Sequence, residues 1–181
     1  HFDENDEIIL RADPIVGNKR ELCLRPPSVL NQLEEGDLIH VDFDTLILRV
    51  TDVPSVAEGR VATKAITGGY IGKNKAVVID PVLEKRFELP ALSEKDFQSI
   101  ALGLQEGIEY LAVSFARSGT AVEEARRAAQ HKMKIISKIE CIDALEQADE
   151  IIQKSDFVLI DRGDLSKEIP IEKIPFTQKV L

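Results

Sequence analysis

The chain has 181 residues, of which 44% are apolar and 30% are charged, and its formal net charge is −9. This length is sufficient for one or two domains with a hydrophobic core. The negative charge argues against general affinity for nucleic acid or anionic membranes, because both are polyanions. No apolar run approaches the roughly 20 residues that cross a membrane.

The first half of the chain, residues 1–89, shows the alternation of apolar and polar residues that is typical of half-buried antiparallel strands. Segments rich in turn-forming residues, such as DPIVGN, EEGD, PSVAEG and TGGYIGKN, separate these stretches. We therefore predict an all-β domain of five to seven strands. The expected strand segments are residues 7–12, 21–26, 37–53, 59–66 and 75–80.

The second half, residues 90–181, shows strands and helices in alternation. Ser93 and Asp96 form a capping-box pattern at the start of a helix expected over residues 93–108. Apolar strands are expected at residues 110–116, 134–140 and 156–165, and amphipathic helices at residues 119–132 and 141–154. A β-α-β-α-β order with apolar strands predicts a parallel sheet and an α/β fold.

Polar residues collect where each of these strands ends. In sheets and barrels of this kind, functional groups gather at the carboxyl ends of the strands. In a closed (β/α) barrel those ends would face a common mouth, so this edge is the predicted site. The residues concerned are Ser114, Arg117, Lys138, Glu140, Asp161, Arg162 and Asp164.

The residue types at this edge suit phosphate or enolate chemistry. Glu140 and Asp164 could hold a divalent cation such as Mg²⁺, which takes one or two carboxylates. Lys138 lies two residues before Glu140, so both side chains point to one face of the strand. The backbone N–H of Gly163 could bind an anionic oxygen. The residues alone leave a second interpretation open, in which Lys138 and Glu140 form a structural ion pair and Asp164 caps the next helix.

Several segments, taken in order, resemble the pyruvate kinase family. ALSEKD, GIEYLAVSFARS, IISKIE, SDFVLIDRGDL and EIPIEKIPFTQK are similar to its LPALSEKD, VSFVR, ISKIEN, ARGDLGVEIP and QK. Earlier segments, GDLIHVDFDTLIL and GGYIGKNKAVVID, extend the resemblance over nearly the whole chain. It implies a partial (β/α)8 TIM barrel, residues 90–181, with an inserted all-β, β-barrel-like lid domain, residues 1–89.

The resemblance also implies an activity. The family transfers the phosphoryl group of phosphoenolpyruvate to ADP, which gives pyruvate and ATP in glycolysis. Lys138 matches the catalytic lysine that stabilises the phosphoryl group and the enolate. Glu140 and Asp164 match the ligands of Mg²⁺ or Mn²⁺.

Two further sets of residues match binding positions of the family. Arg162, Gly163 and Asp164 match the RGD segment whose backbone amides hold the substrate carboxylate. Lys75 matches a lid lysine that meets the nucleotide phosphates. The family also uses K⁺ and forms homo-oligomers, so we expect both for the complete chain, although the K⁺ ligands of the family lie outside this segment.

Some positions depart from the family pattern. Asp161 replaces a small residue, Ser166 a glycine and Lys167 an apolar residue in DRGDLSK. Asp161 adds negative charge near the expected metal, unless its place along the strand turns it away. The lid segments DFDTLI and KAVVIDP lose a turn glycine and hinge residues of the family.

The chain lacks the family segments NFSHG, DTKGPE and TATQMLESM, so we expect an incomplete portion that is inactive by itself. Two alternative functions stay open. One is a Mg²⁺-dependent lyase or decarboxylase of 2-oxo acids on the same fold, and the other is a non-catalytic paralogue that binds a metabolite. Widely separated cysteines, Cys23 and Cys141, and an acidic start unlike a signal peptide favour the cytoplasm.

Overall fold

The computed structural model describes residues 1–42, 44–53, 59–79 and 87–181. The described part of the chain forms two compact units, His1–Leu89 and Pro90–Leu181. Each unit has its own hydrophobic core. Parts of the predicted PSVAEG turn, of DFDTLI and of the KAVVIDP segment lie outside the described residues.

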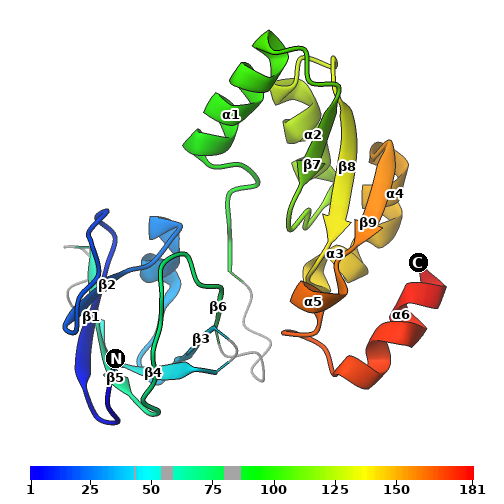
Figure 1. The fold of residues 1–181 in the computed structure, drawn as a ribbon. Helices are drawn as coiled ribbons and strands as arrows, with labels where there is room; N and C mark the ends of the chain where they lie inside the picture. Colours follow the sequence, from blue (N-terminus) through cyan, green and yellow to red (C-terminus); the bar gives the residue numbers. More distant parts are fainter. Residues whose placement is uncertain (43, 54–58, 80–86) are drawn as a thin grey trace. The chain divides into compact units, whose positions relative to one another are not determined.

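The first unit is built on a six-stranded sheet whose strands follow the order β2-β1-β5-β4-β3-β6. Its pairings are antiparallel except for β1 with β2, which is parallel. In Figure 1 the strands of this unit curve around its interior. The elements are β1 (Glu7–Arg11), β2 (Glu21–Cys23), η1 (Pro27–Gln32), β3 (Leu38–Val41), β4 (Leu46–Asp52), β5 (Arg60–Ala65) and β6 (Val77–Ile79).

The core of the first unit follows from the period-2 pattern of its strands. Leu46, Leu48 and Val50 of β4 are buried, while Arg49, between Leu48 and Val50, is exposed. The segment 37–53, which reads as one strand in the sequence, is a hairpin of β3 and β4. The chain reverses at Asp42 and Asp44, whose φ angles are 52° and 64°.

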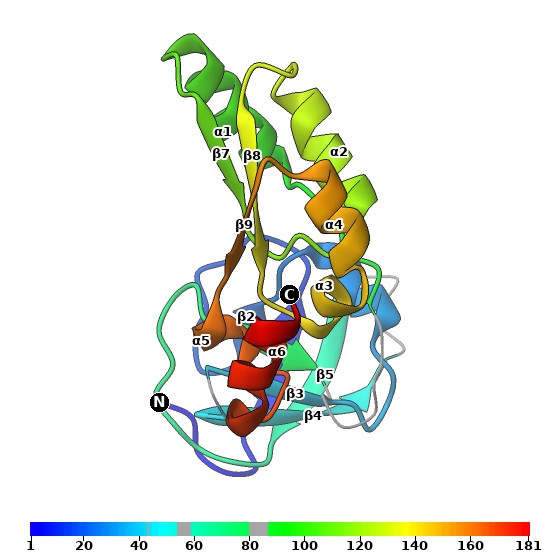
Figure 2. The ribbon, with the colours of Figure 1, turned by 90° about the vertical axis from the view of Figure 1, so that its right-hand side faces the viewer.

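The second unit contains a parallel sheet of β7, β8 and β9 in that order. Figure 2 shows α2 and α4 along one side of these strands, and both helices contact β8. The elements are α1 (Glu94–Gln105), β7 (Tyr110–Val113), α2 (Gly119–Ala128), β8 (Lys134–Ile139), α3 (Ile142–Glu146), α4 (Ala148–Lys154), β9 (Phe157–Ile160), α5 (Arg162–Leu165), η3 (Ile171–Lys173) and α6 (Ile174–Val180).

The predicted capping box is confirmed at the start of α1. The Ser93 side chain accepts from the Asp96 backbone, and the Asp96 side chain accepts from the Ser93 backbone. The segment 141–154, predicted as one helix, is divided into α3 and α4 at Gln147. The predicted strand 156–165 ends at Ile160, after which RGDL forms the short helix α5.

The sheet of the second unit has one covered face. Ile135 and Ile139 of β8 are fully buried against the helices. In contrast, the apolar residues of β9 are open, with Phe157 49% exposed and Leu159 45% exposed. An apolar strand exposed in this way has room for further packing partners. Within the described residues, no helix is both long and apolar enough to cross a membrane.

Candidate active site at the carboxyl ends of the parallel strands

Lys138 lies near the end of β8, on the face that the helices leave uncovered, and its side chain is 22% exposed. Its ammonium group pairs with the carboxylate of Glu140 and with that of Asp161, whose Oδ2 lies 3.2 Å from Nζ. The pKa of Lys138 is raised above its ordinary value, mainly by the pairing with Glu140 and further by the pairing with Asp161. Lys138 is therefore a fixed positive charge at neutral pH.

Glu140 follows β8 directly and is 1% exposed. Its Oε2 accepts a hydrogen bond of 2.7 Å from the backbone N–H of Phe115, at the end of β7. Its Oε1 accepts no hydrogen bond of regular geometry from the described residues and pairs with Lys138. A buried carboxylate requires such partners, so the Phe115 amide and the lysine together hold the charge of Glu140 in place.

Asp161 follows β9 and is the cap residue of α5. Its Oδ1 accepts from the backbone N–H groups of Gly163, at 3.2 Å, and Asp164, at 3.4 Å. Its other oxygen pairs with Lys138, and this pairing lowers the pKa of Asp161. The Asp161 side chain thus points toward the other charged residues, whereas the sequence left its direction open.

Asp164 lies on α5, which Figure 1 shows at the end of β9 where the chain leaves the sheet. Its Oδ1 pairs with the ammonium of Lys167, three residues later. The interpretation of Asp164 as the cap of this helix is wrong, because Asp161 provides the cap. Asp161 and Lys167, two positions where the sequence departs from the pattern that it resembles, both contact expected site residues. Asp161 contacts Lys138, Gly163 and Asp164, and Lys167 contacts Asp164.

Three carboxylates meet at this edge of the sheet. One oxygen from each of Glu140, Asp161 and Asp164 lies within 4.8 Å of the others. Carboxylate oxygens are the ligands that Mg²⁺ and Mn²⁺ prefer. Glu140 and Asp164, the two carboxylates that the sequence predicted, therefore fit a hard divalent cation. Asp161 places a third carboxylate close to them, and its oxygens are paired with Lys138 and the amides of α5.

The expected substrate-binding segment lies in the same place. Gly163 and Arg162 are exposed on α5. The Gly163 N–H, which the resemblance assigns to a substrate carboxylate, donates to the Asp161 side chain. The structure thus brings Lys138, Glu140, Gly163 and Asp164 together around Asp161.

Lys75, the expected nucleotide-binding residue, belongs to the first unit. Its Nζ lies 2.7 Å from Oδ2 of Asp42, in the turn that follows β3. Both side chains are partly exposed, at 38% and 26%. The ion pair holds the ammonium near the β3–β4 hairpin of this unit.

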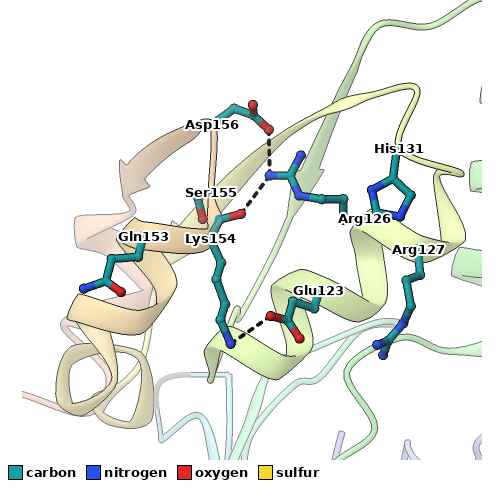
Figure 3. Close-up of a pocket in the computed structure, with 8 residues that line it drawn as sticks. All are labelled: Glu123, Arg126, Arg127, His131, Gln153, Lys154, Ser155 and Asp156. Carbon is teal, nitrogen blue, oxygen red and sulfur yellow. Dashed lines mark hydrogen bonds and ion pairs between the residues drawn. The ribbon is translucent and has the colours of Figure 1, made fainter.

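A groove of about 660 Å³ lies at the other end of the strands, before β9 begins. Figure 3 shows that four of its charged residues, Glu123, Arg126, Lys154 and Asp156, contact one another in pairs. Arg126 of α2 donates to the backbone oxygen of Lys154 at 2.7 Å and to Asp156 at 2.8 Å, and Lys154 pairs with Glu123 at 3.0 Å. These contacts join α2 to the turn between α4 and β9, which is a structural role.

Two contributions to the site were not identified in the sequence. The amide of Phe115 holds Glu140, yet a backbone group leaves no signal in the residue type. Phe115 has a φ of 49°, which is uncommon for a residue other than glycine. The sequence shows Asp161 as an added negative charge, but its contact with Lys138 depends on the turn after β9.

Comparisons with known proteins all point to one family. The family model described as "Pyruvate kinase, barrel domain" matches residues 2–181. The pyruvate kinase of Methylorubrum extorquens is 34% identical over 178 residues, which are 98% of this chain and 36% of that protein. Pyruvate kinase from Geobacillus stearothermophilus is 30% identical in an alignment that covers 98% of this chain and 30% of the relative.

A human relative gives the same result. "Pyruvate kinase PKLR" is 31% identical in an alignment that covers 98% of this chain and 31% of the human protein. The chain therefore spans about a third of the length of the curated relatives that it matches.

Proposed function

Because the chain belongs to the pyruvate kinase family, we propose that the complete polypeptide transfers the phosphoryl group of phosphoenolpyruvate to ADP and releases pyruvate and ATP. The observation that carries the proposal is the group of opposite charges at the ends of β8 and β9. Lys138, Glu140 and Asp164 lie together there, in a chain that the family matches along nearly its whole length.

In this proposal, residues 90–181 are part of a (β/α)8 barrel and residues 1–89 are its lid domain. The exposed apolar residues of β9 support the first assignment, because in a barrel they would be covered by further strands and interior side chains. The antiparallel sheet of the first unit is compatible with a separate lid. Homo-oligomer formation of the complete chain stays a prediction.

Glu140 and Asp164 would hold the divalent cation, while Asp161 stays paired with Lys138 and the amides of α5. Bound there, Mg²⁺ or Mn²⁺ would supply positive charge to the oxygens of the phosphoryl group and of the enolate. Glu140 is suited to this role because the Phe115 amide fixes one of its oxygens and leaves the other directed at the charged cluster.

Lys138 would stabilise negative charge that develops during the reaction. Its raised pKa keeps the ammonium group protonated at neutral pH, so it can face the phosphoryl oxygens while the bond to the enol oxygen breaks. The backbone N–H groups of Gly163 and Asp164 would hold the substrate carboxylate. Lys75 would meet the nucleotide phosphates once its contact with Asp42 opens.

The test is ADP-dependent release of pyruvate from phosphoenolpyruvate by the full-length protein, with Mg²⁺ and K⁺ present. We expect turnover by the parent protein and a loss of at least about 100-fold in Lys138→Ala, as for removal of a group that stabilises transition-state charge. Lys134→Ala is the matched control, because Lys134 lies on the same strand at its other end. It should keep near-parental turnover.

Thermal unfolding and Mn²⁺ binding of each variant show whether it is folded and binds metal. A folded, metal-binding parent protein without turnover would contradict the proposal. It would direct attention to cleavage or decarboxylation of 2-oxo acids. Equal losses in the two lysine variants would contradict the role of Lys138.

A further inference from the structure

We propose that Asp161 is an internal competitor of the substrate carboxylate, so that this side chain sets the affinity of the site for small carboxylate ligands. The inference rests on the proposed function, which places the substrate carboxylate on the amides of α5 and the oxygens that gain charge during the reaction at Lys138. It adds a residue that neither the reaction nor the family pattern requires at this position.

The contacts of Asp161 are those of a bound anion. One oxygen accepts from the N–H groups of Gly163 and Asp164, at 3.2 and 3.4 Å, and the other lies 3.2 Å from the Lys138 ammonium. Two amides and a cation therefore surround a single carboxylate. These are the donors that the proposed function assigns to the substrate, and Asp161 engages all three.

A ligand carboxylate must displace Asp161 to reach these donors. Two carboxylates close to Lys138 would repel each other, and the repulsion is strong because Glu140 is already present and buried. The Asp161 side chain is 33% exposed, so water can receive it when it leaves. Binding thus includes the cost of moving one charged side chain.

Total charge does not explain the effect. Lys167, the other charged departure from the family pattern, pairs with Asp164 and adds one positive charge where Asp161 adds one negative charge. Compared with the family pattern, which has uncharged residues at both positions, the two residues together leave the net charge of the cluster unchanged. The specific consequence of Asp161 is therefore positional, since it occupies the donors that face a ligand.

Two substitutions separate this role from simpler ones. Asp161→Asn keeps an oxygen for the amides of Gly163 and Asp164 but loses the charge that pairs with Lys138. Asp161→Ala frees the amides as well as the lysine. Asp156→Asn is the matched control, because Asp156 stands at the other end of β9 and likewise accepts from a backbone amide and an arginine.

The experiment measures binding of pyruvate to the full-length protein in saturating Mn²⁺ by calorimetry, together with the Kd for Mn²⁺ alone. We expect the Kd for pyruvate to fall about tenfold in Asp161→Ala and several-fold in Asp161→Asn. Asp156→Asn should leave it unchanged. The Kd for Mn²⁺ should change less than about threefold in each variant.

Other results would overturn the inference. Asp161 would be only a helix cap if the Kd for pyruvate were unchanged in both variants and the Tm were lower in Asp161→Ala but not in Asp161→Asn. A Kd for Mn²⁺ weakened tenfold or more in both Asp161 variants would make it a metal ligand. Absence of pyruvate binding in the parent protein and in Asp161→Ala would also refute it.

The turnover assay distinguishes this inference from the proposed function. If the parent protein does not turn over phosphoenolpyruvate but Asp161→Ala binds pyruvate more tightly, the competitor role holds and the kinase proposal fails. If the parent protein turns over and neither Asp161 variant changes the Kd for pyruvate, the kinase proposal holds and the competitor role fails.

Discussion

At the scale of single residues, the site depends on side chains whose direction the period-2 pattern partly predicts. Lys138 and Glu140 are two residues apart, and their common face followed from the pleat of β8. Asp161, like Glu140, lies one residue beyond its strand, but the chain enters α5 directly after it, so the pleat of β9 did not predict its direction. The positive φ of Phe115 was equally hidden, since phenylalanine does not favour that conformation.

Glu168 provides a test at this scale. Its Oε2 accepts from the N–H of Ile142 at the start of α3, and burial raises the pKa of its carboxyl group. The folded chain therefore binds this proton more tightly than the unfolded chain. The resulting stability is complete below the ordinary pKa of 4.5 and is lost as the pH rises through the higher folded value.

We predict that Glu168→Gln, which stays neutral at every pH, is more stable than the parent chain at neutral pH. The difference should vanish in acid below the ordinary glutamate pKa. Urea unfolding at a series of pH values measures it. Glu172→Gln is the control, because Glu172 is exposed and should show no such dependence. A variant less stable than the parent at neutral pH would contradict the argument.

At the scale of elements, the sequence predicted the order of strands and helices better than their ends. The capping box of Ser93 and Asp96 identified α1 because its chemistry is local. The reversal between β3 and β4 was missed, since aspartates rather than glycine take the positive φ there. Gln147 divides α3 from α4 without a proline or glycine to indicate it.

The contact between α2 and the turn before β9 is the second test. Arg126 binds both the Lys154 carbonyl and Asp156, and Asp156 also accepts from the N–H of Ile135 on β8. We predict that Arg126→Ala lowers the free energy of unfolding by about 1–2 kcal/mol, a reduced value because both side chains are partly exposed.

Urea unfolding of the variant measures this loss. Arg127→Ala is the matched control, since Arg127 is the next residue and is exposed. Its effect should stay within about 0.5 kcal/mol. Equal effects of the two substitutions would show that the contacts in Figure 3 contribute nothing specific to stability.

At the scale of the whole molecule, the two units have separate cores. Leu48 belongs to the core of the first unit and Ile135 to that of the second, and both are 0% exposed. In the sequence, the change from alternating apolar and polar residues to a β/α pattern near residue 90 predicted an all-β half followed by an α/β half. The parallel pairing of β1 with β2 was not predicted, because neighbouring segments with this pattern normally form antiparallel pairs.

We predict that each core substitution acts on its own unit. Leu48→Ala should reduce the protection of β4 amides in native-state hydrogen exchange by about 2–5 kcal/mol and leave β8 amides nearly unchanged. Ile135→Ala should do the reverse. Equal loss in both units after either substitution would show that they unfold as one.

The short stretch of chain that carries the candidate site has a consequence for the order of folding. Lys138, Glu140, Asp161 and Asp164 all lie in the single stretch of chain that runs from β8 through β9 to α5. The entropy of closing a short loop is small, so these residues can meet early, while water still surrounds them. Lysine and carboxylates would then be paired before the core closes over Glu140, and the chain would avoid burying a charge without its partner.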